Sequence, residues 1–363
     1  MTHEEQSLIG AAEGRALADR ALRAEGLSAQ DAGQVADALV DTSLRGIDTH
    51  GLRLLPQYLD ELATGVARPR PDIRPVRDRG AGLLLDADGA LGVVAGLAAA
   101  RLAAERAAGL GVCAVAVRNS NHFGAASVYT RELARQELVG LAVTSAASRV
   151  APYGGVEPLF GTNPISLAAA TGADEFALDM ATSQVCFGEI KQRRSEARQL
   201  GNGWATDRSG LATGDPDAAY ALSPLGGYKG QGLAMAVTLL GSVLTGTPPD
   251  WRLSQVGEGG PGGREVGHLL LAFDPAAFTG KERFAEGLSE LLTAVREAPP
   301  AAAGAPVVAP GDPQRDHARE RTRTGIPLDA ATARFFSALA GRFGEPSPFR
   351  RSADRAPATE VPA

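Results

Sequence analysis

The chain has 363 residues, of which 44% are hydrophobic and 21% are charged. This length allows one large or two ordinary domains, and this balance is typical of a globular protein with a buried core. The 42 acidic residues outnumber the 36 lysines and arginines, so the net charge is -6. Nothing in this charge balance favours a basic face for a nucleic-acid backbone, and we expect no nucleic-acid partner.

The sequence also lacks the patterns of membrane and secreted proteins. No apolar run reaches the length of a membrane span, and the start Met-Thr-His-Glu-Glu-Gln lacks the charged and apolar regions of a signal peptide. Cys113 and Cys186 both lie in apolar stretches, which favours two buried reduced thiols over a disulfide or a metal pair. We therefore expect a cytoplasmic protein with no membrane partner.

The first half of the chain alternates between helical and extended patterns. Ser28 is expected to cap the second helix, with Asp31 in the first turn of that helix. Three prolines over residues 69–75 indicate an extended linker. The predicted helices cover residues 4–26, 29–45, 53–64, 92–108 and 125–136. The predicted strands cover residues 83–86, 112–117 and 138–144.

The second half opens with a long loop rich in Gly, Pro and Asn over residues 151–164. Residues 298–306 and 345–363 are low in complexity, and the second of these segments is predicted to be a disordered tail. The predicted strands cover residues 165–169, 176–180 and 269–273. The predicted helices cover residues 185–199, 280–297 and 328–343, with another in the apolar segment from 233 to 244.

Mixed strands and helices, with helices concentrated at both ends, predict an α/β protein built around a central sheet. We expect a helical domain made from residues 1–75 and 313–344, which the two ends of the chain build together. Residues 76–312 are expected to form the sheet domain.

The segment from Ser223 to Leu233 combines four glycines with Lys229 and leads into an apolar helix. Glycines let the backbone approach a ligand, and a helix start presents free N–H groups to an anion. The segment matches neither the phosphate loop G-x-x-x-x-G-K-[ST] nor the dinucleotide fingerprint G-x-G-x-x-G. It therefore predicts an anion site, with phosphate the first expectation, outside the usual nucleotide loops.

Two of the five histidines, His50 and His122, lie between a regular element and a glycine turn. Loops after strand ends commonly display catalytic groups. For each histidine alone, a hydrogen-bonded turn residue is favoured by roughly two to one. Of the others, His268 precedes an apolar strand and is interpreted as a core or strand-edge residue, and His317 lies in a charged, solvated run.

Further polar groups have two interpretations each. Asp179 follows a strand and could cap a helix or bind a ribose hydroxyl. An arginine near a catalytic histidine would suit a carboxylate substrate, although a solvated arginine is more common. Arg45, Arg53 and Arg118 flank the two histidines. No metal-ligand spacing and no G-x-S-x-G elbow occurs, so we expect neither a metal site nor a serine hydrolase.

Seven motifs together make the chain, from about residue 5 to residue 343, resemble the type-2 malate/L-lactate dehydrogenase family. That family includes malate, sulfolactate and ureidoglycolate dehydrogenases, 2,3-diketogulonate reductase and Δ1-piperideine-2-carboxylate reductase. The order of the motifs makes the resemblance specific, since each alone would be weak. The segments that carry it are residues 45–51 (Arg-Gly-Ile-Asp-Thr-His-Gly), 119–124 (Asn-Ser-Asn-His-Phe-Gly), 161–165 (Gly-Thr-Asn-Pro-Ile), 179–183 (Asp-Met-Ala-Thr-Ser), 203–207 (Gly-Trp-Ala-Thr-Asp), 224–230 (Pro-Leu-Gly-Gly-Tyr-Lys-Gly) and 325–328 (Gly-Ile-Pro-Leu).

The resemblance implies hydride transfer between NAD or NADP and C2 of a small 2-hydroxy or 2-oxo acid, or of a cyclic imine. It implies a non-Rossmann nicotinamide-binding fold with a mixed central sheet, a helical domain and a homodimer. His50 and His122 match the two positions from which different family members take the acid/base residue. The catalytic arginine is expected to be Arg53, and Arg45 and Arg118 stay open as alternatives for the substrate carboxylate. The cofactor would contact Ser145, Asp179, Met180, Ala181, Lys229, Gly230, Gly311 and Asp312.

Several residues depart from the family pattern near the expected site. The arginine that often follows the first histidine by four residues is Leu54 here, and Arg53 lies one residue earlier, about 100° away on a helix. Glu189 replaces a usual lysine and Thr238 a usual acidic residue. Three functions stay open: a 2-hydroxy acid dehydrogenase, a cyclic imine reductase or other specialised biosynthetic reductase, and a non-catalytic binding relative. The sequence does not choose between NAD and NADP, because no Rossmann-type acidic residue applies.

Overall fold

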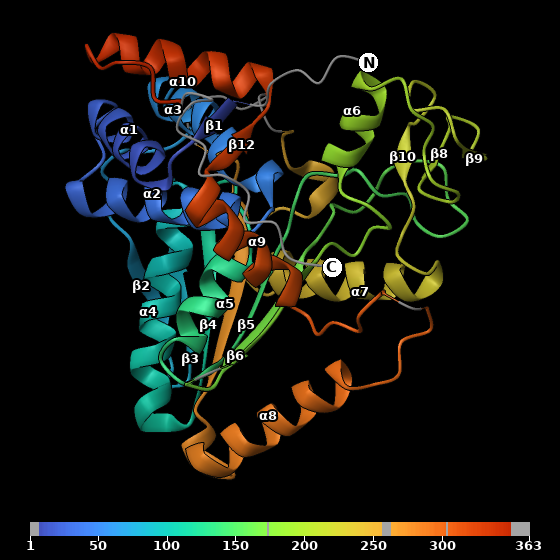
Figure 1. Cartoon of the computed structure of the whole chain (residues 1–363). Coiled ribbons are helices and arrows are strands. Elements are labelled where there is room, and N and C mark those ends of the chain that lie inside the picture. The colour runs from blue at the N-terminus through green and yellow to red at the C-terminus, as the bar shows by residue number, and fades with distance from the viewer. Residues whose placement is uncertain (1–6, 173, 256–262, 303, 350–363) are drawn as a thin grey trace. The chain divides into compact units, whose positions relative to one another are not determined.

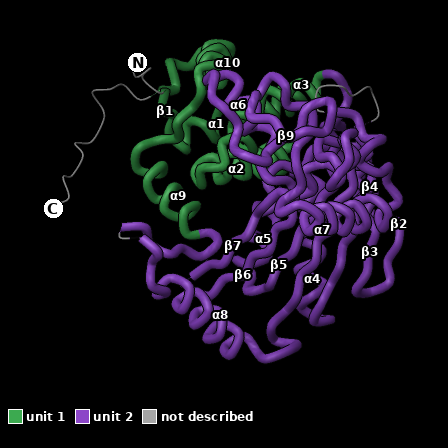
Figure 2. The backbone as a smooth tube through the Cα atoms, turned by 90° about the vertical axis from the view of Figure 1, so that its right-hand side faces the viewer, with its two compact units in different colours: residues 1–63, 312–363 green, residues 64–311 purple. Residues whose placement is uncertain are grey.

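The computed structural model describes residues 7–172, 174–255, 263–302 and 304–349, and the chain forms two compact units (Figure 2). Unit 1 combines residues 1–63 with residues 312–363, and unit 2 comprises residues 64–311. The tail predicted over residues 345–363 lies, from residue 350 onward, outside the described residues.

Unit 1 is helical and is closed by a short ladder between the two ends of the chain. Strand β1 (Ser7–Ile9) pairs antiparallel with β12 (Ile326–Leu328). The Ser28 hydroxyl accepts a hydrogen bond from the Asp31 N–H at 3.0 Å, which confirms the predicted cap. The helices are α1 (Ala11–Ala24), α2 (Ala29–Leu44), α3 (Leu55–Ala63), α9 (Asp312–Thr324) and α10 (Ala330–Arg342).

Two predictions for this unit were wrong. The helix expected from residue 4 begins at Ala11, because Ser7–Ile9 pairs with a strand more than 300 residues away. Helix α9 was missed because its charged sequence has no apolar stripe. Its Arg321 holds Asp48 through two hydrogen bonds of 2.6 and 3.1 Å, so tertiary contacts support this helix.

Unit 2 is built on one mixed sheet of seven strands among the described residues (Figure 1). Strands β3 and β4 are parallel, and every other neighbouring pair is antiparallel. The sheet confirms the predicted mixed α/β, non-Rossmann architecture. Its order is β2 (Arg74–Asp78), β3 (Gly82–Asp86), β4 (Val112–Ser120), β11 (Val266–Phe273), β5 (Val139–Thr144), β6 (Ile165–Ala170) and β7 (Glu175–Met180).

Helices cover both faces of this sheet. Helices α4 (Gly92–Leu110) and α5 (Ser127–Ala134) pack on one face, and α7 (Tyr228–Thr238), continued by the π-helical segment Leu239–Val243, packs on the other. Side chains of β11 alternate accordingly, since Leu269 and Leu271 join the core under α7. The remaining elements of unit 2 are α6 (Phe187–Ser195), α8 (Lys281–Arg296) and a small sheet of β8 (Ala205–Thr206), β9 (Ala212–Thr213) and β10 (Ala221–Leu222).

Candidate active site

Several of the expected site residues lie at one end of the strands of the large sheet. Strands β3, β4, β5 and β7 run in the same direction, so their carboxyl ends lie at the same edge. His122 follows the end of β4, Ser145 follows β5, and Asp179 is next to last in β7. In unit 2 these segments therefore lie on the same side of the sheet, and loops at such an edge are well placed to bind a ligand.

The loop that carries His122 is fixed by its neighbours. The buried Asn121 side chain donates to the carbonyl oxygens of Gly89 and Ala90 at 2.9 and 3.0 Å. Its amide oxygen accepts from the Arg264 N–H at 3.0 Å. The His122 side chain itself is half-buried. The backbone around this histidine is thus held from two directions.

Asp179 caps a helix other than the one considered from the sequence. Its carboxylate accepts a hydrogen bond of 2.8 Å from the backbone N–H of Ser127, the first residue of α5. Burial raises the pKa of this carboxyl group, and the hydrogen bonds from Ser127 and Ala126 oppose that shift. Beside it, the Ala177 N–H donates to Pro310 at 3.0 Å, which brings the loop of Gly311 against β7.

The glycine-rich segment lies directly against the Asp179 loop. The Leu225 N–H donates to Thr182 at 2.9 Å, and the Gln184 N–H donates to Ser223 at 2.8 Å. Helix α7 begins at Tyr228, earlier than predicted, so the exposed Lys229 and the buried Gly230 lie in its first turn.

Gly230 is required by packing. A Cβ atom at this position would lie 2.2 Å from the carbonyl oxygen of Leu225. Gly227 precedes the helix with a φ of 71°, a backbone conformation that favours glycine. A helix N-terminus with an adjacent lysine and closely packed glycines fits an anionic group such as a phosphate of a dinucleotide.

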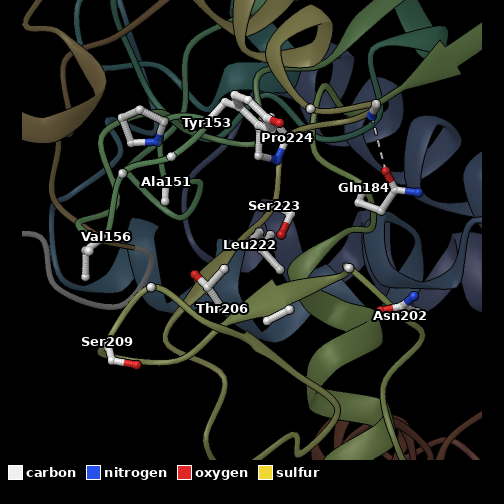
Figure 3. A pocket seen from close by; sticks show the side chains of 18 residues that line it. Ala151, Tyr153, Val156, Gln184, Asn202, Thr206, Ser209, Leu222, Ser223 and Pro224 are labelled. Carbon is white, nitrogen blue, oxygen red and sulfur yellow. Dashed lines mark hydrogen bonds between the residues drawn. The ribbon is translucent and has the colours of Figure 1, made fainter.

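A cavity of about 490 Å³ borders this glycine turn (Figure 3). Its labelled side chains include the polar residues Tyr153, Gln184, Asn202, Thr206 and Ser223, and its lining holds no charged residue. The buried hydroxyl of Thr206 has no hydrogen-bond partner within the described part of the chain. The cavity therefore suits a neutral hydrogen-bonding group rather than a carboxylate.

His50 lies in unit 1, in the short helical turn Asp48–His50. The Thr49 hydroxyl lies 2.9 Å from Nδ1 of His50, and Arg321 of α9 holds the neighbouring Asp48. Burial lowers the pKa of His50, so its imidazole is neutral near pH 7. A neutral imidazole is the form that accepts a proton.

The three arginines differ in their surroundings. Arg118 pairs with Asp86 through bonds of 3.0 and 3.1 Å. Arg45 is buried and lies 3.7 Å from Asp41. The Arg53 side chain is half exposed, and Asp329 lies 3.7 Å from its Nε, beyond hydrogen-bond distance. Arg45 and Arg53 thus lie at the same distance from their acidic neighbours, and Arg53 in unit 1 is the more exposed of the two.

Sequence reasoning missed two buried polar groups that support the site. His268 lies inside β11 between two hydroxyl groups. The carboxylate of Asp250 accepts from the Gly161 N–H, the Asn163 amide and the Thr238 hydroxyl at 2.9, 2.7 and 2.9 Å. Thr238 thus contacts an acidic group at the place where the family resemblance expects one.

Among the residues that the structure describes, no cluster of three or more His, Cys, Asp or Glu side chains could hold a metal ion. No helix there is long and apolar enough to cross a membrane. Cys113 is buried, Cys186 is half-buried, and both are free thiols.

Comparison with known proteins gives a consistent result over most of the chain. The family model described as malate/L-lactate dehydrogenase matches residues 9–336. The L-sulfolactate dehydrogenase of Methanocaldococcus jannaschii is 35% identical over 85% of this chain and 89% of its own. The NADP(+)-dependent (2R)-3-sulfolactate dehydrogenase of Chromohalobacter salexigens is 37% identical over 80% and 87%. The NAD(+)-dependent ureidoglycolate dehydrogenase of Escherichia coli O157:H7 is 32% identical over 84% and 87%.

Solved structures agree with the sequence comparison. The M. jannaschii sulfolactate dehydrogenase superposes with a TM-score of 0.86 and 32% identity, covering 93% of this chain and 98% of that one. The Δ1-piperideine-2-carboxylate reductase of Pseudomonas syringae superposes with a TM-score of 0.82 and 29% identity, covering 92% and 99%.

Proposed function

The chain belongs to the malate/L-lactate dehydrogenase family, and from that premise we propose that it is an NAD(P)-dependent oxidoreductase acting at C2 of a small 2-hydroxy or 2-oxo acid. The observation that carries the proposal is that, in unit 2, the residues His122, Ser145 and Asp179 lie at or just after the carboxyl ends of β4, β5 and β7, on the same side of the sheet. Relatives that use NAD(+) and NADP(+) both match the chain, so either cofactor fits.

The cofactor-binding residues in the proposal are Ser145, Asp179–Ala181, Lys229–Gly230 and Gly311–Asp312. The first turn of α7 supplies free N–H groups and the Lys229 ammonium, which would hold a phosphate. The Asp179 loop is bonded to the segment before Lys229, which would keep these groups in a fixed relation. When bound, the nicotinamide ring supplies the hydride chemistry.

A histidine moves the proton in this proposal. A hydride leaves C2 of a hydroxy acid only as the hydroxyl group loses its proton, so a base must be within reach. His50 is neutral because burial lowers its pKa, and His122 is held by the fixed loop after β4. We assign the general acid/base role to these two histidines.

The substrate carboxylate is assigned to Arg53. Its guanidinium fork can pair both oxygens of a carboxylate and so orient the C2 hydrogen toward the nicotinamide. Replacing Arg53 by Lys should raise the KM for the acid at least about tenfold, because a lysine cannot form the paired contact. The matched change Arg118→Lys should leave that KM within about threefold, since Asp86 already holds Arg118.

A cyclic imine reductase is the second candidate. The structural similarity to Δ1-piperideine-2-carboxylate reductase favours it, as do the departures from the family pattern at Leu54, Glu189 and Thr238. The same cofactor and the same proton donor would serve reduction of a C=N bond. Comparing Δ1-piperideine-2-carboxylate with pyruvate and oxaloacetate as substrates separates the two candidates.

A homodimer is part of the proposal. Four apolar or aromatic residues along one side of α7 and its continuation are each more than half exposed: Tyr228, Met235, Leu239 and Val243. No charged residue occurs from Gly230 to Pro249, so a second copy would meet this surface without charge repulsion. Leu239→Glu should convert the dimer to a monomer in sedimentation, whereas Leu291→Glu on α8 should not. A parent chain that sediments as a monomer would contradict this point.

The proposed function is tested by binding and turnover together. NADH or NADPH should raise the melting temperature and quench the fluorescence of Trp204 and Trp251. His50→Ala and His122→Ala should each lower kcat by about 100-fold or more, as loss of a general acid/base does. Full activity in both variants, or no cofactor binding by the parent protein, would contradict the proposal.

A further inference from the structure

His268 is fully buried in β11 and connects two neighbouring strands through its ring nitrogens. Its Nδ1 lies 2.7 Å from the Thr144 hydroxyl at the end of β5. Its Nε2 lies 2.8 Å from the Ser120 hydroxyl at the end of β4. One imidazole therefore joins the ends of the two strands that lead to His122 and Ser145.

The hydrogen-bond partners fix the direction of both contacts. The Thr144 hydroxyl carries one proton, and the carbonyl oxygens of Ser145 and Gly267 lie 3.0 and 3.2 Å away as acceptors. Thr144 therefore accepts from Nδ1–H of His268, and Nε2 accepts from the Ser120 hydroxyl. Ser120 thus donates a hydrogen bond to His268, His268 donates one to Thr144, and Thr144 donates to the backbone carbonyl oxygens.

The ring has no freedom to leave this arrangement. The Phe123 ring stacks on it with centroids 4.1 Å apart and planes 28° apart. On the other side of Phe123, Tyr129 of α5 packs at 4.1 Å. The Ser145 N–H donates to Gly267 at 3.1 Å, beside His268 itself. Burial lowers the pKa of His268 to about 3, so the imidazole stays uncharged around pH 7.

We propose that His268 is a positioning residue for the hydride-transfer reaction, which rests on the function proposed above. Its Nε2 fixes the end of β4 two residues before the acid/base candidate His122. Its Nδ1 fixes the end of β5 one residue before the cofactor-binding candidate Ser145. His268 does not touch substrate or exchange a proton with it. It sets the position of a catalytic loop relative to a cofactor loop.

Two conservative variants address the two contacts. Ser120→Ala removes the contact to Nε2 of His268. Thr144→Val keeps the side-chain shape and removes the contact to Nδ1 together with the hydroxyl's bonds to the Ser145 and Gly267 carbonyl oxygens. Ser120→Ala should lower kcat at least about tenfold and keep the nicotinamide Kd within about threefold. Thr144→Val should raise that Kd at least about tenfold and affect kcat less. His268→Gln, which can still donate and accept, should retain more activity than His268→Phe.

A merely structural histidine predicts a different outcome. Both variants would then lower the melting temperature while leaving kcat and Kd unchanged, or would change kcat and Kd in the same proportion. Either result overturns the proposal. An inactive parent protein contradicts the proposed function. An active parent in which Ser120→Ala does not mainly lower kcat, and Thr144→Val does not mainly raise the nicotinamide Kd, contradicts only the role of His268.

The tautomer gives a readout that does not depend on activity. Nitrogen-15 NMR of the histidine side chains should show one ring with Nδ1 protonated and Nε2 unprotonated, unchanged from pH 8 to pH 5. In Ser120→Ala the Nε2 shift of this ring should move, because its donor is gone. A His268 ring that is protonated at Nε2, or that titrates within this range, overturns the proposal.

Discussion

A Cβ atom at Gly92 would lie 2.2 Å from the carbonyl oxygen of His122, so the first turn of α4 and the loop of this histidine pack backbone against backbone. Gly92→Ala must push the loop away and should lower kcat at least about tenfold, since small displacements of a catalytic group are costly. Steady-state kinetics with the preferred acid would measure the loss.

Gly109 of the same helix is the matched control, because a Cβ there meets nothing within 4 Å. Gly109→Ala should keep full activity and raise stability by up to about 1 kcal/mol through helix propensity. Equal activity in the two variants would show that the contact between Gly92 and His122 does not position the histidine.

The buried group of Asp250, Asn163 and Thr238 predicts a charge effect. Thr238→Asp would place a second carboxylate beside Asp250 and should destabilise the fold by about 3 kcal/mol or more at pH 7. Thr238→Val, which only removes a hydrogen bond, should cost about 1 kcal/mol. Urea unfolding measures both values.

Exchanging the two residues completes this test. The double variant Thr238→Asp with Asp250→Thr should recover most of the stability lost in Thr238→Asp, because one carboxylate is again present. If the double variant is less stable than Thr238→Asp alone, position 238 cannot accommodate the buried carboxylate.

His268 makes the fold sensitive to acid. Because its folded-state pKa is lowered to about 3 from 6.5, stability from this group is fully present above pH 6.5 and falls as the pH drops toward 3. At pH 5 the loss is about 2 kcal/mol. Free energies of unfolding measured from pH 7 to pH 5 should therefore fall less steeply in His268→Phe than in the parent.

Other groups also titrate in acid, so the comparison is between slopes rather than absolute stabilities. Burial raises the pKa of Asp250, for example, which acts in the opposite sense at low pH. His317→Gln, which replaces an exposed histidine of α9, should keep the parent slope. If it flattens the slope as much as His268→Phe does, the acid sensitivity does not come from burial.

Lys229 tests the anion site. Lys229→Ala should weaken nicotinamide dinucleotide binding by about 10- to 100-fold, because this loss of affinity is expected when a charge-assisted hydrogen bond is removed. Lys191→Ala on α6, which removes a lysine that packs on Phe187, should leave the affinity within about threefold. Isothermal titration calorimetry gives both values, and an unchanged Kd in Lys229→Ala would exclude the phosphate role.

Local sequence patterns predicted much of the fold. The β-branched run from Val112 and the alanine-rich segment 92–108 became β4 and α4, because burial and local preference point to the same structure there. Strands of two residues such as Ala205–Thr206 were not predicted, since so short a segment has no detectable period.

Long-range partners account for what the sequence could not show about the site. His268 was interpreted only as a core or strand-edge residue, because Ser120 and Thr144 approach it through the strand order of the sheet. Asp250 lies beyond the segment that contains Thr238, and only the fold brings the pair to 2.9 Å. The roles of His50, His122 and Arg53 remain predictions that depend on catalysis experiments.

The transfer of label from the nicotinamide tests the central claim most directly. The protein would be incubated with NADH or NADPH carrying deuterium at the transferable C4 position, together with pyruvate, oxaloacetate, sulfopyruvate or Δ1-piperideine-2-carboxylate. Mass spectrometry of the product should find one deuterium at C2 of the hydroxy acid or cyclic amino acid, and His122→Ala should form it far more slowly. Product without deuterium at C2, or no product from any of these acids while the cofactor binds, would contradict the account.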